Sequence, residues 1–238
     1  QPGATRVGGG PFLAMRYVPG QSLQQAIAQS AEQGQTHVVL PRRAGDSEQA
    51  AILRFVEQAA HALHAAHEAG LVHRDVKPGN LLVARDSDPV LVDFGLARDD
   101  EGEVRSLTLT GDLLGTPSYM APEQISGGVV DRRADVHALG VVLYECLTLR
   151  LPFEAANRHD LQARILRSEA PDPRAAHRGI SGDLWTVLQT ALAKDPAHRY
   201  HTAAAFAEDL RRLRAHEPIV ARPIARVLRA WRWTQRHP

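Results

Sequence analysis

The chain contains 238 residues, of which 28 are basic and 27 acidic, so its formal net charge at pH 7 is +1. This balance argues against wholesale nucleic-acid binding, and we expect no nucleic-acid partner. The single cysteine, Cys146, excludes an internal disulfide framework and favours a reducing, cytoplasmic compartment. We recognise no signal peptide, and the longest apolar run, 138–149, contains Glu145 and is too short to span a bilayer.

The first half of the chain is predicted to combine short strands with helices. Residues 1–10 are glycine-rich without periodicity, so we expect them to be disordered. A strand over 11–18 ends at the turn signal Pro19-Gly20. The other predicted elements are a helix over 22–30 capped by Ser22, a long helix over 47–69 followed by Gly70, and two strands over 81–83 and 90–92 that form a hairpin.

The second half is predicted to be helical. In the whole chain 44% of the residues are hydrophobic. The pattern of apolar residues supports helices over 133–149, 158–168, 183–193 and 202–215. A tail over 216–238 follows, in which the stretch 222–236 contains five arginines, two tryptophans and no acidic residue. The pattern predicts an α+β domain over 11–215 and a separate basic tail.

Three motifs stand out along the chain. Residues 73–80 read His-Arg-Asp-Val-Lys-Pro-Gly-Asn, residues 93–95 read Asp-Phe-Gly, and residues 115–123 read Gly-Thr-Pro-Ser-Tyr-Met-Ala-Pro-Glu. The predicted hairpin carries the first two motifs on neighbouring loops. Lysine is rare in this chain, which otherwise uses arginine, so Lys77 within the first motif indicates a need for a compact ammonium group.

The first two motifs contain the residue types that phosphoryl transfer requires, since this reaction depends mainly on positioning and charge neutralisation. Asp75 can accept the proton of an attacking hydroxyl, and Lys77 can contact the transferring phosphoryl oxygens. Asn80 and Asp93 offer oxygen ligands for one Mg²⁺ ion, and Gly95 permits the turn that aims Asp93 inward. The alternative is a pair of capped turns with ordinary polar residues.

Together the motifs resemble those of a bacterial serine/threonine protein kinase of the eukaryotic-like type. The resemblance covers residues 11–215 and implies the protein-kinase-like fold, mainly the α-helical C-lobe with the hinge strand and a small β-hairpin. It implies ATP and Mg²⁺ as cofactors and a protein with serine or threonine as substrate. Lys77, together with Thr116 in the Gly-Thr-Pro segment, follows the serine/threonine pattern rather than the tyrosine pattern.

The resemblance also implies individual roles. Asp75 is then the catalytic base, assisted by Lys77 and Thr116, and Asn80 and Asp93 are the Mg²⁺ ligands. The implied adenine-site residues are Met15 as gatekeeper, Tyr17 and Val18 as hinge, and Leu82 beneath the ring. The implied structural residues are His73, Arg74, Phe94, Gly95, Glu123 paired with Arg199, and Asp135, which should hold the backbone near His73.

The sequence departs from the family pattern at its start. No glycine-rich phosphate loop, strand lysine or pairing helix glutamate precedes residue 11, and Gly8-Gly9-Gly10 lacks the Gly-x-Gly-x-x-Gly spacing. Residues 1–10 can then represent only a residual upper-lobe segment. We expect this polypeptide alone to bind Mg-ATP weakly and to transfer phosphate at a negligible rate. Arg16 stands where a hinge acid is common, and His137 where an aromatic residue is common.

Several alternatives stay open. The chain could be a non-catalytic scaffold or pseudokinase remnant, or a small-molecule phosphotransferase of kinase-like fold. Three histidines, His61, His64 and His67, could ligate a metal, although packing histidines are the simpler interpretation. The stretch 222–236 could be a solvated helix or could contact an anionic membrane surface, which would place the protein at the cytoplasmic face of the membrane. The sequence indicates no oligomeric state.

Arg74 precedes the implied base, and in kinases of this pattern such an arginine receives a phosphate from the segment between 93 and 123. That segment offers Ser106, Thr108 and Thr110, and we expect autophosphorylation at one or more of them. The alternative is a solvated loop that happens to contain hydroxyls. Phosphopeptide mapping of the active full-length enzyme tests this, and the absence of phosphate at all three residues would exclude it.

Overall fold

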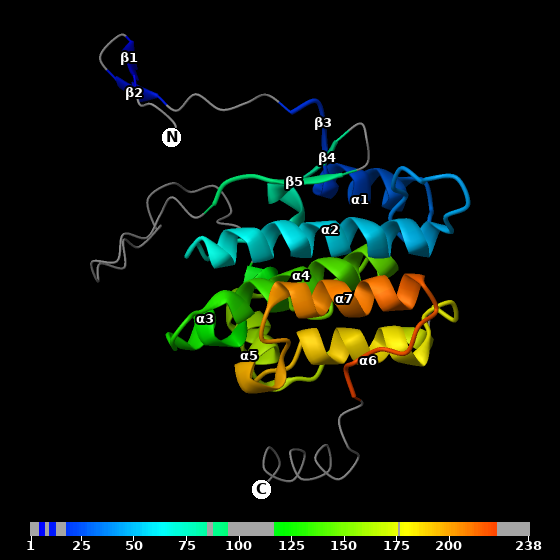
Figure 1. The fold of residues 1–238 in the computed structure, drawn as a ribbon. Coiled ribbons are helices and arrows are strands. Elements are labelled where there is room, and N and C mark those ends of the chain that lie inside the picture. The colour runs from blue at the N-terminus through cyan, green and yellow to red at the C-terminus, as the bar shows by residue number, and fades with distance from the viewer. Residues whose placement is uncertain are drawn as a thin grey trace, which may run out of the picture.

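The computed structural model describes residues 18–84, 88–94, 117–175 and 177–222, and the backbone of residues 5–7 and 10–12. A helical body carries a small antiparallel sheet on one side (Figure 1). The helices are α1 (Leu23–Glu32), α2 (Glu48–Glu68), α3 (Pro122–Ser126), α4 (Arg132–Thr148), α5 (Arg158–Arg167), α6 (Gly182–Ala191) and α7 (Ala203–Arg214). Short 3₁₀ turns occupy η1 (Pro78–Asn80), η2 (Pro117–Tyr119), η3 (Pro173–Ala175) and η4 (Pro196–His198).

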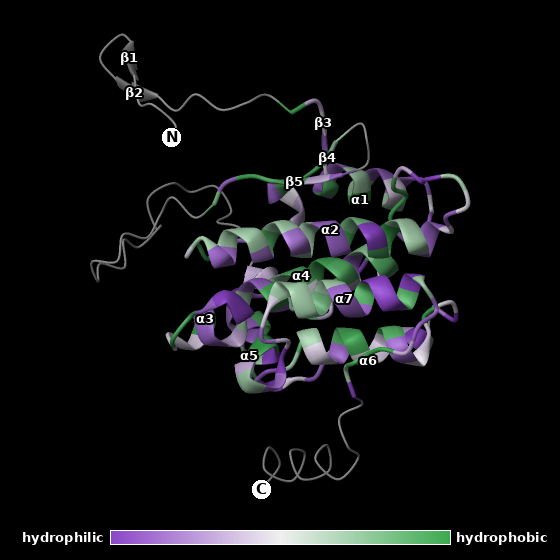
Figure 2. Cartoon of the chain, in the orientation of Figure 1, coloured by the Kyte–Doolittle hydropathy of each residue, from purple (hydrophilic) through white to green (hydrophobic). Residues whose placement is uncertain are grey.

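Helix α4 forms the centre of the helical body. Nearly all of its residues from Ala134 to Thr148 are buried, and a helix without an exposed face must be surrounded by other elements. It packs against α2, α6 and α7, and Figure 2 shows hydrophobic residues along much of its length. Cys146 lies in this core as a free thiol, in agreement with its apolar sequence context, and burial raises its pKa.

The long helices begin at residues whose side chains accept a hydrogen bond from the first turn. Such caps typically stabilise a helix by about 1 kcal/mol. The capping residues are Ser22, Ser47, Asp131, Asn157, Ser181 and Thr202. The ends of the predicted helices agree with the structure to within a few residues, and Gly70 follows α2 with a positive φ of 81°. Helix α3 was not predicted, because its five residues are too few to show a periodic pattern of apolar residues.

The sheet contains one strand more than the predicted hairpin. Strands β4 (Leu81–Ala84) and β5 (Pro89–Leu91) pair antiparallel as expected, with Leu82 opposite Val90. Strand β3 (Gly20–Ser22) pairs with the other edge of β4, giving the order β3-β4-β5. The turn predicted at Pro19-Gly20 is therefore wrong at Gly20. A Cβ there would lie 2.3 Å from the Val83 carbonyl oxygen, so glycine allows the close approach of the two strands.

The N-terminal residues form a separate hairpin of β1 (Thr5–Val7) and β2 (Gly10–Phe12), with Arg6 opposite Pro11. Residues 1–10 were expected to be disordered or to form a residual upper-lobe segment, and disorder is wrong for Thr5–Val7 and for Gly10, which lie in strands. Only the start of the predicted strand over 11–18 is present as β2, since residues 13–17 lie outside the described residues.

The packed part of the chain continues past the predicted domain end at residue 215. Asp209, which is fully buried on α7, accepts hydrogen bonds from the Tyr200 hydroxyl at 2.9 Å and from the backbone amides of Val220 at 2.7 Å and Ala221 at 2.9 Å. Ile219 packs against the core. Of the basic stretch 222–236, only Arg222 lies within the described residues. Within the described part of the chain, no helix combines the length and the hydropathy that crossing a membrane requires.

Candidate active site

The loop between α2 and β4 places three predicted site residues in direct contact. The Asp75 Oδ2 atom accepts hydrogen bonds from Lys77 Nζ at 2.7 Å and from Asn80 Nδ2 at 3.0 Å. Asn80 Nδ2 also donates to the Asp75 carbonyl oxygen at 2.8 Å. Asn80 is buried in η1, whereas 54% of the Asp75 side chain is exposed. A solvent-accessible carboxylate is thus held in one orientation by a cation and an amide.

The segment 92–94 is joined to the same loop. The Val92 amide donates to the Asn80 carbonyl oxygen at 3.0 Å, and His73 Nε2 donates to the Val92 carbonyl oxygen at 3.1 Å. The rings of His73 and Phe94 lie 4.6 Å apart. Asp93 is exposed and has a positive φ of 58°, a left-handed conformation that is uncommon for a residue other than glycine. These contacts place Asp93 directly after a residue that is bonded to Asn80.

The donor set fits a Mg²⁺ ion. Asn80 directs its amide nitrogen toward Asp75, which leaves its amide oxygen as the ligand atom. Asp93 adds an exposed carboxylate, and Mg²⁺ prefers oxygen ligands and usually keeps several waters and phosphate oxygens in its shell. Asn80 and Asp93 are therefore the residues that would hold the ion.

The loop is anchored to the core through Asp135 on α4. Its carboxylate accepts hydrogen bonds from the His73 amide at 2.8 Å and the Arg74 amide at 2.7 Å. The contact expected near His73 is thus formed. His67 on α2 donates from Nε2 to the same carboxylate at 2.8 Å. Arg74 has a positive φ of 64°, so Asp135 stabilises a strained backbone directly before Asp75.

The predicted pair of Glu123 and Arg199 is present and buried. The Nη1 and Nη2 atoms of Arg199 donate to the two Glu123 carboxylate oxygens at 2.6 and 2.7 Å. Arg199 Nε donates to the Ala193 carbonyl oxygen at 2.7 Å, and further bonds reach the Arg133 and Lys194 carbonyls. This bidentate pair joins the start of α3 to the segment that follows α6.

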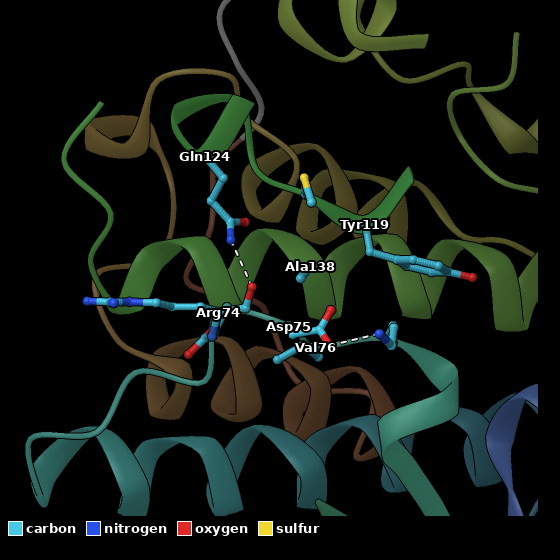
Figure 3. A pocket seen from close by; sticks show the side chains of 9 residues that line it. Arg74, Asp75, Val76, Tyr119, Gln124 and Ala138 are labelled. Atoms are coloured by element: carbon cyan, nitrogen blue, oxygen red, sulfur yellow. Dashed lines mark hydrogen bonds and ion pairs between the residues drawn. The ribbon is translucent and has the colours of Figure 1, made fainter. Parts of the chain in front are cut away.

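A pocket lies beside Asp75 and is lined from both sides of the loop. Its lining includes Arg74, Lys77, Tyr119, Met120 and Gln124, and Figure 3 shows the Gln124 side chain pointing toward Arg74. The Tyr119 hydroxyl donates to Glu145 Oε2 at 2.6 Å. Burial is the main cause that raises the pKa values of both groups, and the neighbouring Glu145 charge raises that of Tyr119 further.

Other predicted site residues are placed only in part. Val18 is half-buried just before β3, and Leu82 on β4 lies opposite Ser22 of β3, so both belong to the region of the small sheet. Seven predicted residues lie outside the described residues: Met15, Tyr17, Gly95, Ser106, Thr108, Thr110 and Thr116.

Sequence reasoning missed the contacts of Gln124, Tyr119 and His67. The sequence contained only partial signals for these contacts. Gln124 directly follows the third motif, and His67 belongs to a run of histidines at helical spacing. His67 bonds Asp135, while His64 Nδ1 lies 3.9 Å from Glu68 Oε1. Among the described residues, no group of three His, Cys, Asp or Glu side chains could hold a metal, so a metal site at the three histidines gains no support.

We expect single alanine substitutions of Glu123 or Arg199 to lower the free energy of unfolding by about 3–5 kcal/mol each, because each leaves an unpaired buried charge. The double variant should lose clearly less than the sum. Urea unfolding measures all three values. Arg174→Ala, which breaks an exposed pair with Asp172, is the control and should cause no comparable loss. Additive single effects would contradict the coupling.

His137 is fully buried in α4, and neither ring nitrogen has a hydrogen-bond partner among the residues that the structure describes. Burial, with smaller contributions from the Arg199 and Lys194 charges, lowers its pKa well below the ordinary value of 6.5. Below about pH 6.5 the unfolded chain therefore binds a proton that the folded chain does not, and stability falls as the pH falls. We expect His137→Phe to show a smaller loss of unfolding free energy between pH 7 and 5; parallel pH profiles for both proteins would contradict this.

Comparison with known proteins agrees with the geometry of the site. The family profile described as "Protein kinase domain" matches residues 10–210. The chain is 36% identical over 208 residues to the serine/threonine-protein kinase PknB of Mycobacterium tuberculosis (strain ATCC 25618 / H37Rv), covering 87% of this chain and 31% of PknB.

Two further relatives agree. Serine/threonine-protein kinase pkn3 of Myxococcus xanthus is 37% identical over 210 residues, covering 85% of this chain and 36% of pkn3. PknL of M. tuberculosis (strain CDC 1551 / Oshkosh) is 37% identical over 200 residues, covering 84% of this chain and 46% of PknL. The chain thus spans less than half the length of these relatives. It belongs to the protein kinase family, among the bacterial serine/threonine kinases of the eukaryotic-like type.

Proposed function

We propose that the protein containing this chain transfers the γ-phosphate of ATP to serine or threonine hydroxyls of proteins. The observation that carries the proposal is the cluster of Asp75, Lys77 and Asn80, in which one carboxylate oxygen is held at 2.7 and 3.0 Å by the other two residues. The names of the relatives, all serine/threonine-protein kinases, support the substrate class.

Asp75 acts as the proton acceptor in this proposal. Lys77 and Asn80 both contact Oδ2, so Oδ1 is assigned to the incoming hydroxyl of the substrate. As the hydroxyl oxygen attacks the γ-phosphorus, the bond from this phosphorus to the oxygen that bridges to the β-phosphate breaks and ADP leaves, and Asp75 takes up the hydroxyl proton. Lys77 lies beside this carboxylate and can shift its ammonium group toward the negative charge of the phosphoryl oxygens.

Bound Mg-ATP supplies the phosphoryl group and a divalent positive charge. Asn80 and Asp93 would hold the metal through their side-chain oxygens, as the donor set of the site permits. The bond between the Val92 amide and the Asn80 carbonyl at 3.0 Å keeps the two ligand-bearing segments in register. Asp75, Asn80 and the residue that precedes Asp93 are therefore parts of one hydrogen-bonded unit.

We expect Asp75→Asn to lower kcat by about 10²–10⁴-fold, the range that a positioned general base contributes. The assay is transfer of radiolabelled phosphate from ATP to a serine- or threonine-containing protein, using the chain expressed with any in-frame coding sequence upstream of residue 1. Asp160→Asn, at the exposed start of α5, is the matched control and should keep full activity. Equal rates for wild type and Asp75→Asn would contradict the assignment and favour a non-catalytic scaffold.

A further inference from the structure

The carbonyl oxygen of the peptide bond that precedes Asp75 accepts a hydrogen bond from a residue outside the loop between α2 and β4. Gln124 on α3 donates from Nε2 to the Arg74 carbonyl oxygen at 2.8 Å, as Figure 3 shows. On the other side of the same residue, the Arg74 amide donates to Asp135 on α4 at 2.7 Å. Arg74, with its φ of 64°, is therefore held at both of its backbone polar groups by two different helices.

Both ends of the Gln124 side chain are used. Its Oε1 atom accepts a hydrogen bond from the Ala121 amide at 2.9 Å, at the N-terminus of α3. The reversed amide would bring Oε1 against the Arg74 carbonyl oxygen and Nε2 against the Ala121 amide, and both contacts would be repulsive. The position thus requires one donor and one acceptor in a fixed order, which glutamine supplies.

Helix α3 is itself fixed in place next to this residue. Glu123 directly precedes Gln124 and forms the buried bidentate pair with Arg199 at 2.6 and 2.7 Å. The segment from Pro117, which leads into α3, also lines the pocket beside Asp75 through Tyr119 and Met120. A displacement of α3 would therefore move Gln124 and pull on the Arg74 carbonyl.

We propose that Gln124 is a positioning residue that makes the orientation of Asp75 depend on the placement of α3. The inference rests on the proposed phosphotransfer function only for its catalytic consequence. The Arg74 carbonyl shares a peptide plane with the Asp75 amide, so loss of the Gln124 bond frees the plane from which the Asp75 side chain projects. Misplacement of a reacting group by about 1 Å can lower a rate by about 10²-fold.

Two variants separate the two bonds of Gln124. Gln124→Met removes both, whereas Gln124→Glu keeps an acceptor for the Ala121 amide and places a carboxylate oxygen against the Arg74 carbonyl. Hydrogen exchange of the 238-residue chain follows the Ala121 bond directly at its donor amide, and it follows the Arg74 carbonyl bond indirectly, through the Arg74 amide that is bonded to Asp135, without any need for activity. We expect the Arg74 amide to exchange at least about fivefold faster in both variants. The Ala121 amide should exchange faster only in Gln124→Met, and the core amide of Val56 on α2 should be unchanged in both.

The catalytic consequence is measured by introducing the same substitutions into the protein that the phosphotransfer assay uses. We expect kcat to fall about tenfold or more in both, with KM for ATP unchanged within about twofold. Gln189→Met is the control, since Gln189 is a half-buried glutamine on α6 whose side chain makes no hydrogen bond within the described part of the structure; it should keep wild-type values.

Three outcomes would overturn the proposal. The first is that Gln124→Glu keeps the wild-type kcat and the wild-type exchange rates. The second is that the amide of Val56 exchanges faster together with that of Arg74, and the third is that only KM for ATP changes. If the wild-type protein itself transferred no phosphate, the proposed function would fail, and the exchange measurements alone would decide whether Gln124 holds Arg74.

Discussion

The candidate site depends on one buried carboxylate, that of Asp135. It accepts hydrogen bonds from two consecutive backbone amides, those of His73 and Arg74, and from the imidazole of His67. An anionic group in the core is costly unless hydrogen bonds replace its hydration, and these three donors do so. Because Asp135 lies on the buried helix α4, the loop that carries Asp75 is attached to the centre of the helical body.

A second set of contacts reaches the same loop from the opposite direction. Arg199, near the end of the segment after α6, pairs with Glu123, and Gln124 then bonds the Arg74 carbonyl. The loop that carries Asp75 is thus held by α4 at the Arg74 amide and by α3 at the Arg74 carbonyl. Spatial continuity of this kind permits energetic coupling between the segments but does not measure it, which is why the variants of Gln124 are informative.

Much of this arrangement could be predicted from the sequence, for identifiable reasons. The helices follow from apolar periodicity and from capping residues such as Ser47 and Thr202, which are local signals. The motif residues Asp75 and Asn80 are close in sequence, so their contact needs only a tight loop. Strand β3 was missed because a three-residue strand begun by Gly20 looks like a turn until its partner strand is known. The role of Gln124 could not be predicted because it depends on a carbonyl fifty positions earlier in the chain.

The segment after α7 has a mechanical consequence. Asp209 ties the amides of Val220 and Ala221 to the Tyr200 hydroxyl, and Tyr200 directly follows Arg199. Tension applied to the chain after residue 222 would load this junction on α7 first. A tether attached downstream would therefore pull on the domain one residue away from the ion pair that anchors α3.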